Sequence, residues 1–170
     1  MTVETEFLIF SADKLTQLMG RIDSCVRKLT PEQIWMRADA NQNAVGNLLL
    51  HLNGNVRQWI LHGVGGQADV RDRDAEFAAK DGAGANELLA RLRATVEEAA
   101  ALFRALPAGR LMDRVDTQGY DCTVLAAIYH VVEHFAGHTF QIIYATKLCT
   151  GEDLGFYAHL SGSAAPDPLP

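Results

Sequence analysis

The chain has few of the features that mark several common protein classes. Only three of its 170 residues are cysteines, Cys25, Cys122 and Cys149, an odd number without CxxC spacing. Such a set predicts neither a disulfide framework nor a thiolate zinc site. Basic residues are also few, with 15 Lys and Arg against 21 Asp and Glu and a formal net charge of -6. Because phosphate recognition needs a basic surface, this balance argues against nucleic acid as a partner.

Long apolar runs and a basic leader are absent as well. No window reaches the roughly 20 consecutive apolar residues of a membrane span. The first ten residues, MTVETEFLIF, lack the basic region of a secretory signal. We therefore expect a cytoplasmic protein that does not contact a membrane. The composition, 48% hydrophobic and 21% charged, is typical of a globular protein, and the length suits a single domain.

Helical periodicity dominates the sequence, and no set of strands able to build a sheet is present. Apolar residues at steps of three and four predict long amphipathic helices over residues 5–29, 43–62, 86–106 and 123–148. The expected N-caps are Asn41 or Asn43, Asn86 and Thr123. A Thr-Pro start signal predicts a short helix or turn over residues 30–35. The pattern predicts an all-α fold, a four-helix bundle with one long crossover connection, formed by residues 1–160 as one domain.

Three segments fall outside the long helices. Residues 63–85 are rich in glycine and charge and predict a long connection with a helical turn near residues 75–79, and such long connections are often functional. Residues 111–123 predict an irregular or briefly extended link. Beyond the last helix, Leu154, Phe156 and Tyr157 are expected to pack back on the domain. Residues 161–170 have the composition of a disordered tail.

The most informative motif is HVVEHFAGH, in which His130, His134 and His138 recur at four-residue steps. Each step advances an α-helix by about 40° beyond a full turn, so the three imidazoles form one slanted stripe beside the core. On the second long helix, His51 is expected on the corresponding flank. His51, His134 and His138 could together hold one divalent ion and leave at least one coordination position for water or substrate, which favours chemistry over a structural role.

The residues alone leave other interpretations open. Imidazole suits zinc, nickel, iron and copper alike. Histidines at this spacing can also form a solvated face or hydrogen-bonded packing, which is the interpretation we prefer for His62 and His159. Glu133 points about 100° away from His134 on a helix, and the HExxH motif is absent. The sequence therefore assigns no catalytic base.

Four segments together resemble a known family. They are VGNLLLHLNGNVRQWI (45–60), RDRDAEF (71–77), GYDCTVLAAIYHVVEHFAGHTFQIIY (119–144) and DLGFY (153–157), and they are similar to the DinB-like (DinB/YfiT-like) metal-binding four-helix bundles, within a branch without assigned activity. The resemblance covers nearly the whole chain and implies that His51, His134 and His138 bind nickel or zinc. The family motif continues after its last histidine with Gly and Gln; here Phe140 replaces the Gly, which puts the pocket shape there in doubt, and Gln141 is kept.

The resemblance also implies a type of chemistry. Characterised relatives include a mycothiol-dependent maleylpyruvate isomerase and a bacillithiol S-transferase, which implies a low-molecular-weight thiol, activated by the metal, that attacks an electrophile. The alternatives are metal-assisted hydrolysis, a non-catalytic stress-related metal-binding module, and a bundle that has lost the ion. We expect a homodimer with a small-molecule substrate.

The expected surroundings of the ion complete the sequence-based hypothesis. Asn55, His130 and Gln141 are expected near its open face, where His130 supports the site or lines the pocket rather than binding the ion. Arg71 and Arg73 are expected to bind a substrate carboxylate. The run RDRD could equally form a self-paired, solvated loop.

Overall fold

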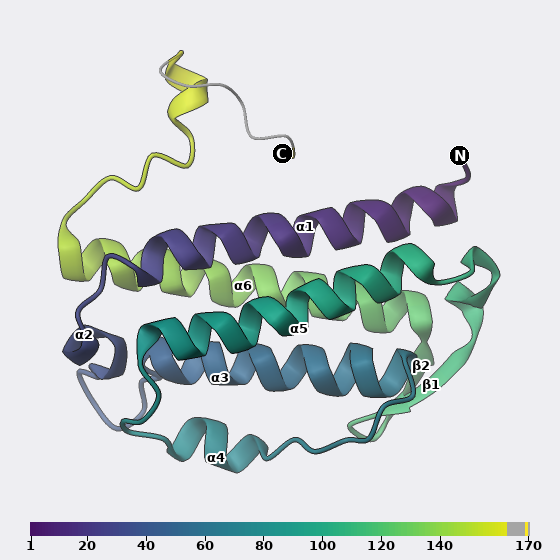
Figure 1. The fold of residues 1–170 in the computed structure, drawn as a ribbon, viewed down its shortest axis with the longest axis horizontal. Coiled ribbons are helices and arrows are strands. Elements are labelled where there is room, and N and C mark those ends of the chain that lie inside the picture. The colour runs from purple at the N-terminus through teal and green to yellow at the C-terminus, as the bar shows by residue number, and fades with distance from the viewer. Residues whose placement is uncertain (163–168, 170) are drawn as a thin grey trace.

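The computed structural model describes residues 1–162 and 169, and this part of the chain is mostly helical (Figure 1). The long helical segments are α1 (Val3–Val26), α3 (Val45–Val56) with its π-helical continuation η1 (Arg57–Val64), α5 (Ala85–Ala105) and α6 (Val124–Thr150). The short elements are α2 (Pro31–Trp35), α4 (Arg73–Ala78), the 3-10 helices η2 (Ala108–Met112) and η3 (Ala158–Ser161), and strands β1 (Arg114–Thr117) and β2 (Tyr120–Thr123). This content agrees with the predicted all-α class.

The long helices pack around one apolar core. α1 contacts α5 and α6, and α3 contacts the same two helices from the other side. Each long helix contributes fully buried side chains, among them Leu15, Leu52, Leu92, Phe103 and Phe135. Because burying one such side chain contributes on the order of 1.5–3 kcal/mol, the periodic apolar positions are what hold these helices together.

The direction of the helices explains the long connection between α3 and α5. They are consecutive among the long helices yet run in the same direction (Figure 1). The chain must therefore return along the length of α3 before α5 begins. Asn47 holds one end of this crossover, because its Nδ2 donates to the carbonyl oxygens of Glu76 and Ala79 at 2.9 and 2.8 Å. Gln58 Nε2 holds the other end by donating to Asp69 Oδ2 at 2.8 Å. The crossover thereby covers one flank of α3.

Several helix ends confirm the predictions made from sequence. Thr30 and Gln33 form the expected capping box at α2, since each side-chain oxygen accepts from the other residue's backbone N–H. Thr123 Oγ1 caps α6 by accepting from the N–H of Ala126 at 3.2 Å. At the other end of α6, Gly151 adopts a left-handed conformation with φ of 69°, which suits a residue without a side chain.

The caps predicted for the next two long helices are wrong. The sequence placed them on asparagines that do not occupy cap positions, namely Asn41, Asn43 and Asn86. α3 instead begins after Ala44, whose N–H donates to Asn47 Oδ1 at 3.0 Å, and α5 begins after Gly84. Asn47 lies inside α3, and its side chain reaches back to the N–H of Ala44. The same side chain binds the crossover, which helps to hold it in this orientation.

The prediction that no sheet forms is also wrong, although the sheet is small. β1 and β2 pair as an antiparallel hairpin, with Arg114 opposite Thr123 and Thr117 opposite Tyr120. Its turn has positive φ angles at Gln118 (57°) and Gly119 (78°). Only a few residues lie in each strand, too few for an alternating pattern to be recognised.

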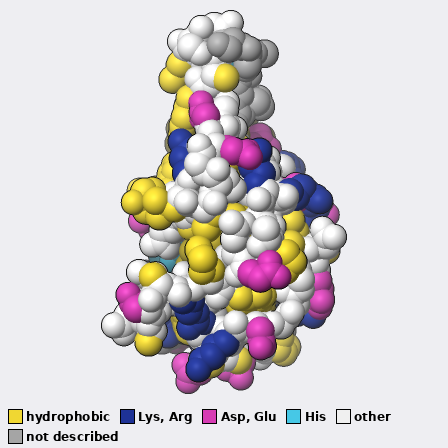
Figure 2. Space-filling model, turned by 90° about the vertical axis from the view of Figure 1, so that its left-hand side faces the viewer, with side chains coloured by type: hydrophobic (Ala, Val, Ile, Leu, Met, Phe, Trp, Pro, Cys, Tyr) yellow, Lys and Arg dark blue, Asp and Glu magenta, His cyan; other side chains and the backbone are white. Residues whose placement is uncertain are grey.

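The segment after α6 packs as predicted only in part. Leu154 and Phe156 pack against the core, whereas Tyr157 is 55% exposed. The predicted disordered tail, residues 161–170, lies largely outside the described residues. Charged side chains of both signs are interspersed over the face shown in Figure 2, and little histidine surface is visible there. None of the helices among the described residues is both long and apolar enough to span a membrane.

Candidate metal centre

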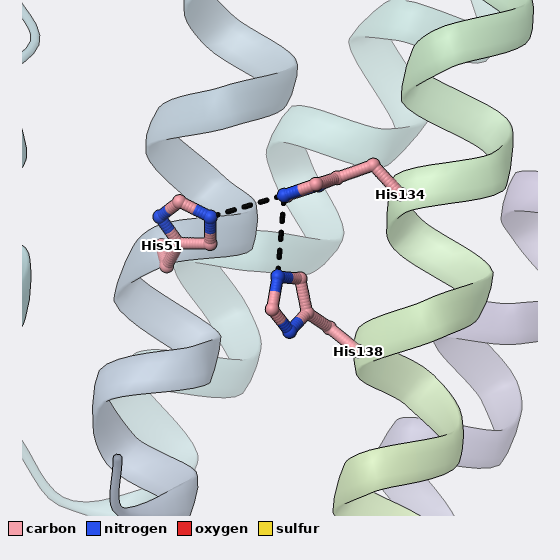
Figure 3. Close-up of side chains that lie close together, drawn as sticks. All are labelled: His51, His134 and His138. Atoms are coloured by element: carbon pink, nitrogen blue, oxygen red, sulfur yellow. Dashed lines mark hydrogen bonds between the residues drawn. The ribbon is translucent and has the colours of Figure 1, made fainter. Parts of the chain in front are cut away.

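The structure brings together the three histidines that the sequence singled out. His51 projects from α3, and His134 and His138 project from consecutive turns of α6 (Figure 3). The Nε2 atom of His134 lies 3.1 Å from Nε2 of His51 and 3.2 Å from Nε2 of His138. One ring nitrogen from each residue lies within 4.8 Å of the other two. The cluster could therefore hold a metal ion.

Hydrogen bonds on the far side of two rings fix which nitrogen faces the cluster. His51 Nδ1 donates to Glu76 Oε2 at 3.0 Å, and His138 Nδ1 donates to Gln141 Oε1 at 2.8 Å. Because both acceptors are oxygens, both protons lie on Nδ1 and the Nε2 atoms carry lone pairs in the neutral rings. These two lone pairs face His134 Nε2.

A cation suits this arrangement better than the imidazoles alone do. If His134 carries its proton on Nε2, that proton can be donated well to only one of the two neighbouring Nε2 atoms. If the proton lies on Nδ1 instead, the lone pairs of all three Nε2 atoms face one another and repel. His134 Nδ1 is itself buried without a hydrogen-bond partner among the described residues. Nitrogens bound tetrahedrally to zinc at about 2.0–2.1 Å lie about 3.3–3.4 Å from one another, and the two separations from His134, 3.1 and 3.2 Å, are only slightly shorter. The residues therefore fit a divalent ion.

Burial favours the neutral form of His134 and His138, which is the form that metals bind. Burial, with a smaller contribution from the charges of the neighbouring imidazoles and of Arg71, lowers the pKa of His134 to about 3. Burial also lowers the pKa of His138, although the hydrogen bond with Gln141 opposes it. The pKa of His130 is lowered by burial as well. At neutral pH His134 and His138 therefore need release no proton before a metal binds.

Glu76, which the sequence did not single out, supports His51 from the crossover. Its carboxylate accepts from Arg71 Nε at Oε1 and from Arg71 Nη2 at Oε2, both at 2.8 Å, in addition to the bond from His51. Burial acts to raise the pKa of Glu76, but the hydrogen bonds from Arg71 and His51 outweigh it and the pKa is lowered. A carboxylate that accepts from the outer nitrogen of a metal-binding histidine orients the ring and increases its basicity.

Gly54 provides the space for this carboxylate. A Cβ atom at Gly54 would lie 1.8 Å from Glu76 Oε1 and 2.9 Å from Arg71 Nε. Since real Cβ atoms do not approach other atoms so closely, a side chain at position 54 would displace the Glu76 carboxylate and the Arg71 guanidinium from their present positions. The position of the Glu76–Arg71 pair against α3 thus depends on the absence of a side chain at Gly54.

The two arginines predicted to bind substrate lie in different surroundings. The Arg71 side chain is 2% exposed, and its guanidinium is occupied by Glu76 and, through Nη1 at 2.9 Å, by Gln58 Oε1. This arrangement makes Arg71 a support for Glu76. Arg73 is exposed, and its guanidinium lies 4.8 Å from the ring centroid of Phe77, which packs in turn against His51.

A pocket of about 360 Å³ opens beside the cluster. Residues that line it include His51, Asn55, Arg73, Tyr120, His130 and His134. The His130 ring lies 4.3 Å from that of Trp59 and 5.6 Å from that of His134, so it forms part of the wall. The hairpin, which the sequence did not predict, supplies Tyr120 and Gln118 to the same pocket.

Phe140, the departure from the family motif, lies away from this pocket. It is 50% exposed and borders a separate hollow together with Leu154 and Phe156 of the segment after α6. Its neighbour Gln141 contacts His138 as described above. The change from Gly to Phe therefore does not alter the lining of the pocket beside His134.

Comparison with known proteins identifies a family without an assigned activity. A solved structure titled as the conserved protein of a locus from Enterococcus faecalis aligns with a TM-score of 0.74 over 89% of this chain and 99% of that chain. At 15% sequence identity this likeness concerns the fold alone. No protein with curated annotation matches. The family model described as "Protein of unknown function (DUF1572)" matches residues 2–161, and the chain therefore belongs to the DUF1572 family.

Proposed function

We propose that the chain is a DinB-like four-helix bundle in which His51, His134 and His138 bind one divalent ion, nickel or zinc. The observation that carries this proposal is the convergence of the three Nε2 atoms, two of them aimed by hydrogen bonds from Glu76 and Gln141. Three protein ligands leave room for a further molecule, which distinguishes catalytic from structural sites.

The proposed activity is a metal-dependent transfer reaction that uses a low-molecular-weight thiol. A divalent ion at the three histidines would lower the pKa of a thiol brought to it and so supply a thiolate at neutral pH. His130 lines the pocket as a neutral imidazole and can accept the thiol proton at a ring nitrogen. The thiolate sulfur then forms a bond to an electrophilic carbon of the second substrate, and the leaving group departs with its bonding pair. His130 returns the proton to the leaving group.

The first experiment tests the metal site. Protein prepared without a histidine tag is titrated with Ni²⁺ and Zn²⁺, and its metal content is measured by mass spectrometry. We expect one ion per chain in the wild type and a loss of binding in His51→Ala, His134→Ala and His138→Ala. His159→Ala, in the segment after α6, is the matched control and should bind one ion. Undiminished binding in all three site variants would refute the assignment.

The second experiment separates catalysis from metal binding alone. Metal-loaded protein is incubated with bacillithiol, mycothiol or glutathione and an electrophilic substrate, and thiol consumption is followed. Turnover that needs both metal and thiol supports the transferase. Ester or amide cleavage without thiol indicates metal-assisted hydrolysis instead. Metal binding without either reaction indicates a non-catalytic module.

A further inference from the structure

The pocket beside the three histidines contains a polar group that metal binding does not use. Asn55 lies on α3 one turn after His51, is 3% exposed and lines the pocket. Its Oδ1 is buried and has no hydrogen-bond partner among the described residues. Buried acceptors are almost always paired, and an unpaired one is unfavourable. A bound molecule with a hydrogen-bond donor would satisfy it.

The pocket also carries an uncompensated positive charge. Arg71 is neutralised by the two hydrogen bonds it donates to Glu76. Arg73, in contrast, makes no ion pair among the described residues and lies over the Phe77 ring. Within the described part of the chain, no aspartate or glutamate belongs to the lining. An anion entering the pocket therefore meets a cation and no like charge.

One wall of the pocket is aromatic. Tyr120 and His130 line it, and Trp59 packs behind them with ring centroids 6.0 Å from Tyr120 and 4.3 Å from His130. Tyr120 lies beside the hairpin turn and is 63% exposed. Flat rings backed by a buried tryptophan suit a planar apolar group.

From these three features we infer that the pocket binds a small carboxylate that also carries an N–H donor and a planar group. Arg73 pairs with the carboxylate, Asn55 Oδ1 accepts from the N–H, and Tyr120 and His130 flank the planar group. A volume of about 360 Å³ limits the ligand to a small molecule. Such a ligand would be a substrate of the proposed enzyme, and this assignment rests on the proposed function. Its binding to the pocket can be measured without metal.

Hippurate, which combines a carboxylate, an amide N–H and a phenyl ring, is a suitable probe. O-benzoylglycolate replaces its N–H by an ester oxygen, and hippuramide replaces its carboxylate by a neutral amide. Calorimetric titrations are made on chelator-treated and on metal-loaded protein. We expect hippurate to bind best and O-benzoylglycolate to bind about 3- to 10-fold more weakly. Hippuramide should bind more weakly than hippurate by about 10-fold or more.

Variants assign each preference to a residue. Asn55→Ala should remove the preference for hippurate over O-benzoylglycolate, and Asn55→Asp should retain it while binding both anions more weakly, since it keeps the acceptor but adds a negative charge. Arg73→Ala should remove the preference for hippurate over hippuramide. Arg91→Ala, an exposed arginine on α5, is the matched control and should change neither ratio. Because each readout compares two ligands on the same protein, a general loss of folded protein does not alter it.

Three results would overturn the inference: no measurable binding of hippurate, equal affinity of the wild type for the three probes, or preferences that persist in Asn55→Ala and Arg73→Ala. Failure of the metal proposal gives a different pattern. In that case the protein takes up no nickel or zinc while the chelator-treated and metal-treated samples bind hippurate equally.

Discussion

The Glu76 carboxylate accepts a 3.0 Å hydrogen bond from His51 Nδ1 across the boundary between the crossover and α3. The same carboxylate oxygen accepts from Arg71 Nη2, which consequently lies 3.1 Å from His51 Nδ1. The orientation of His51 is therefore determined by a segment that contributes no ligand to the cluster. A change in the crossover should be measurable as a change in metal affinity.

Glu76→Gln tests this relationship directly. The substitution removes the negative charge that favours the Nδ1 proton of His51, and we expect the affinity for Ni²⁺ or Zn²⁺ to fall about 10- to 100-fold. It also leaves the buried Arg71 without its counter-ion, which should lower the free energy of unfolding by about 3–5 kcal/mol. Metal titration calorimetry and urea unfolding measure the two effects. Asp74→Asn, an exposed acid on the same short helix, is the control; unchanged affinity in Glu76→Gln would contradict the role of Glu76.

Gly54→Ala should disturb the same metal site through packing alone, without a change of charge. Its new methyl group would occupy the position of Glu76 Oε1, so the Glu76 carboxylate must shift from the position in which it accepts from His51. We expect weaker metal binding and lower stability by about 1–3 kcal/mol. Gly20→Ala and Gly137→Ala are matched helical controls, because a Cβ at either position meets nothing within 4 Å. Both should be neutral or slightly stabilising, by up to about 1 kcal/mol. If Gly54→Ala behaves like these controls, the close approach of the crossover does not support the site.

The long helices and the three histidines could be predicted from sequence because both follow helical periodicity. His51, His134 and His138 lie on regular helices, where spacing alone determines which side chains share a flank. Glu76 could not be found in this way. It lies in RDRDAEF, where its link to Arg71 and His51 depends on the path of the crossover.

Pocket residues outside the helices were missed for a related reason. Tyr120 and Gln118 enter the pocket through a hairpin whose turn depends on positive φ angles at Gln118 and Gly119. Arg71, which was expected to bind substrate, belongs to the lining of the pocket, but its guanidinium is engaged by the acceptors Glu76 and Gln58, which lie on different segments. Tertiary contacts of this kind have no local signature in the sequence.

His130→Ala should separate metal binding from the proton transfer proposed for His130. The ring forms the pocket wall beside Trp59, and its centroid lies 5.6 Å from that of His134. We therefore expect the variant to bind one ion per chain with nearly unchanged affinity, while thiol turnover falls about 10²- to 10⁴-fold as for loss of a general base. Metal analysis and thiol consumption are measured on the same preparation. A loss of the bound ion would instead identify His130 as a ligand.

Asp23 gives a prediction of acid sensitivity that is independent of the metal site. It joins α1 to α5, because Arg93 Nη2 on α5 donates to Asp23 Oδ1 at 2.8 Å, and Arg27 Nε at the end of α1 donates to Oδ2 at 2.6 Å. The hydrogen bond from Arg27, with a further contribution from Arg93, lowers the pKa of Asp23 although partial burial opposes it. Between this lowered pKa and the unfolded value of 3.8, the unfolded chain binds more protons, so stability rises with pH in this interval.

Asp23→Asn should therefore lower the free energy of unfolding by about 1 kcal/mol at neutral pH. The contribution is fully present above the unfolded pKa and is lost as the pH falls through the folded pKa, so the difference between variant and wild type should shrink in acid. Urea unfolding at a series of pH values from neutral to acidic measures this convergence. Added salt should reduce the difference at neutral pH, because the ion pairs of Asp23 lie near the surface. A difference that stays constant at all pH values and salt concentrations would instead indicate altered helix packing.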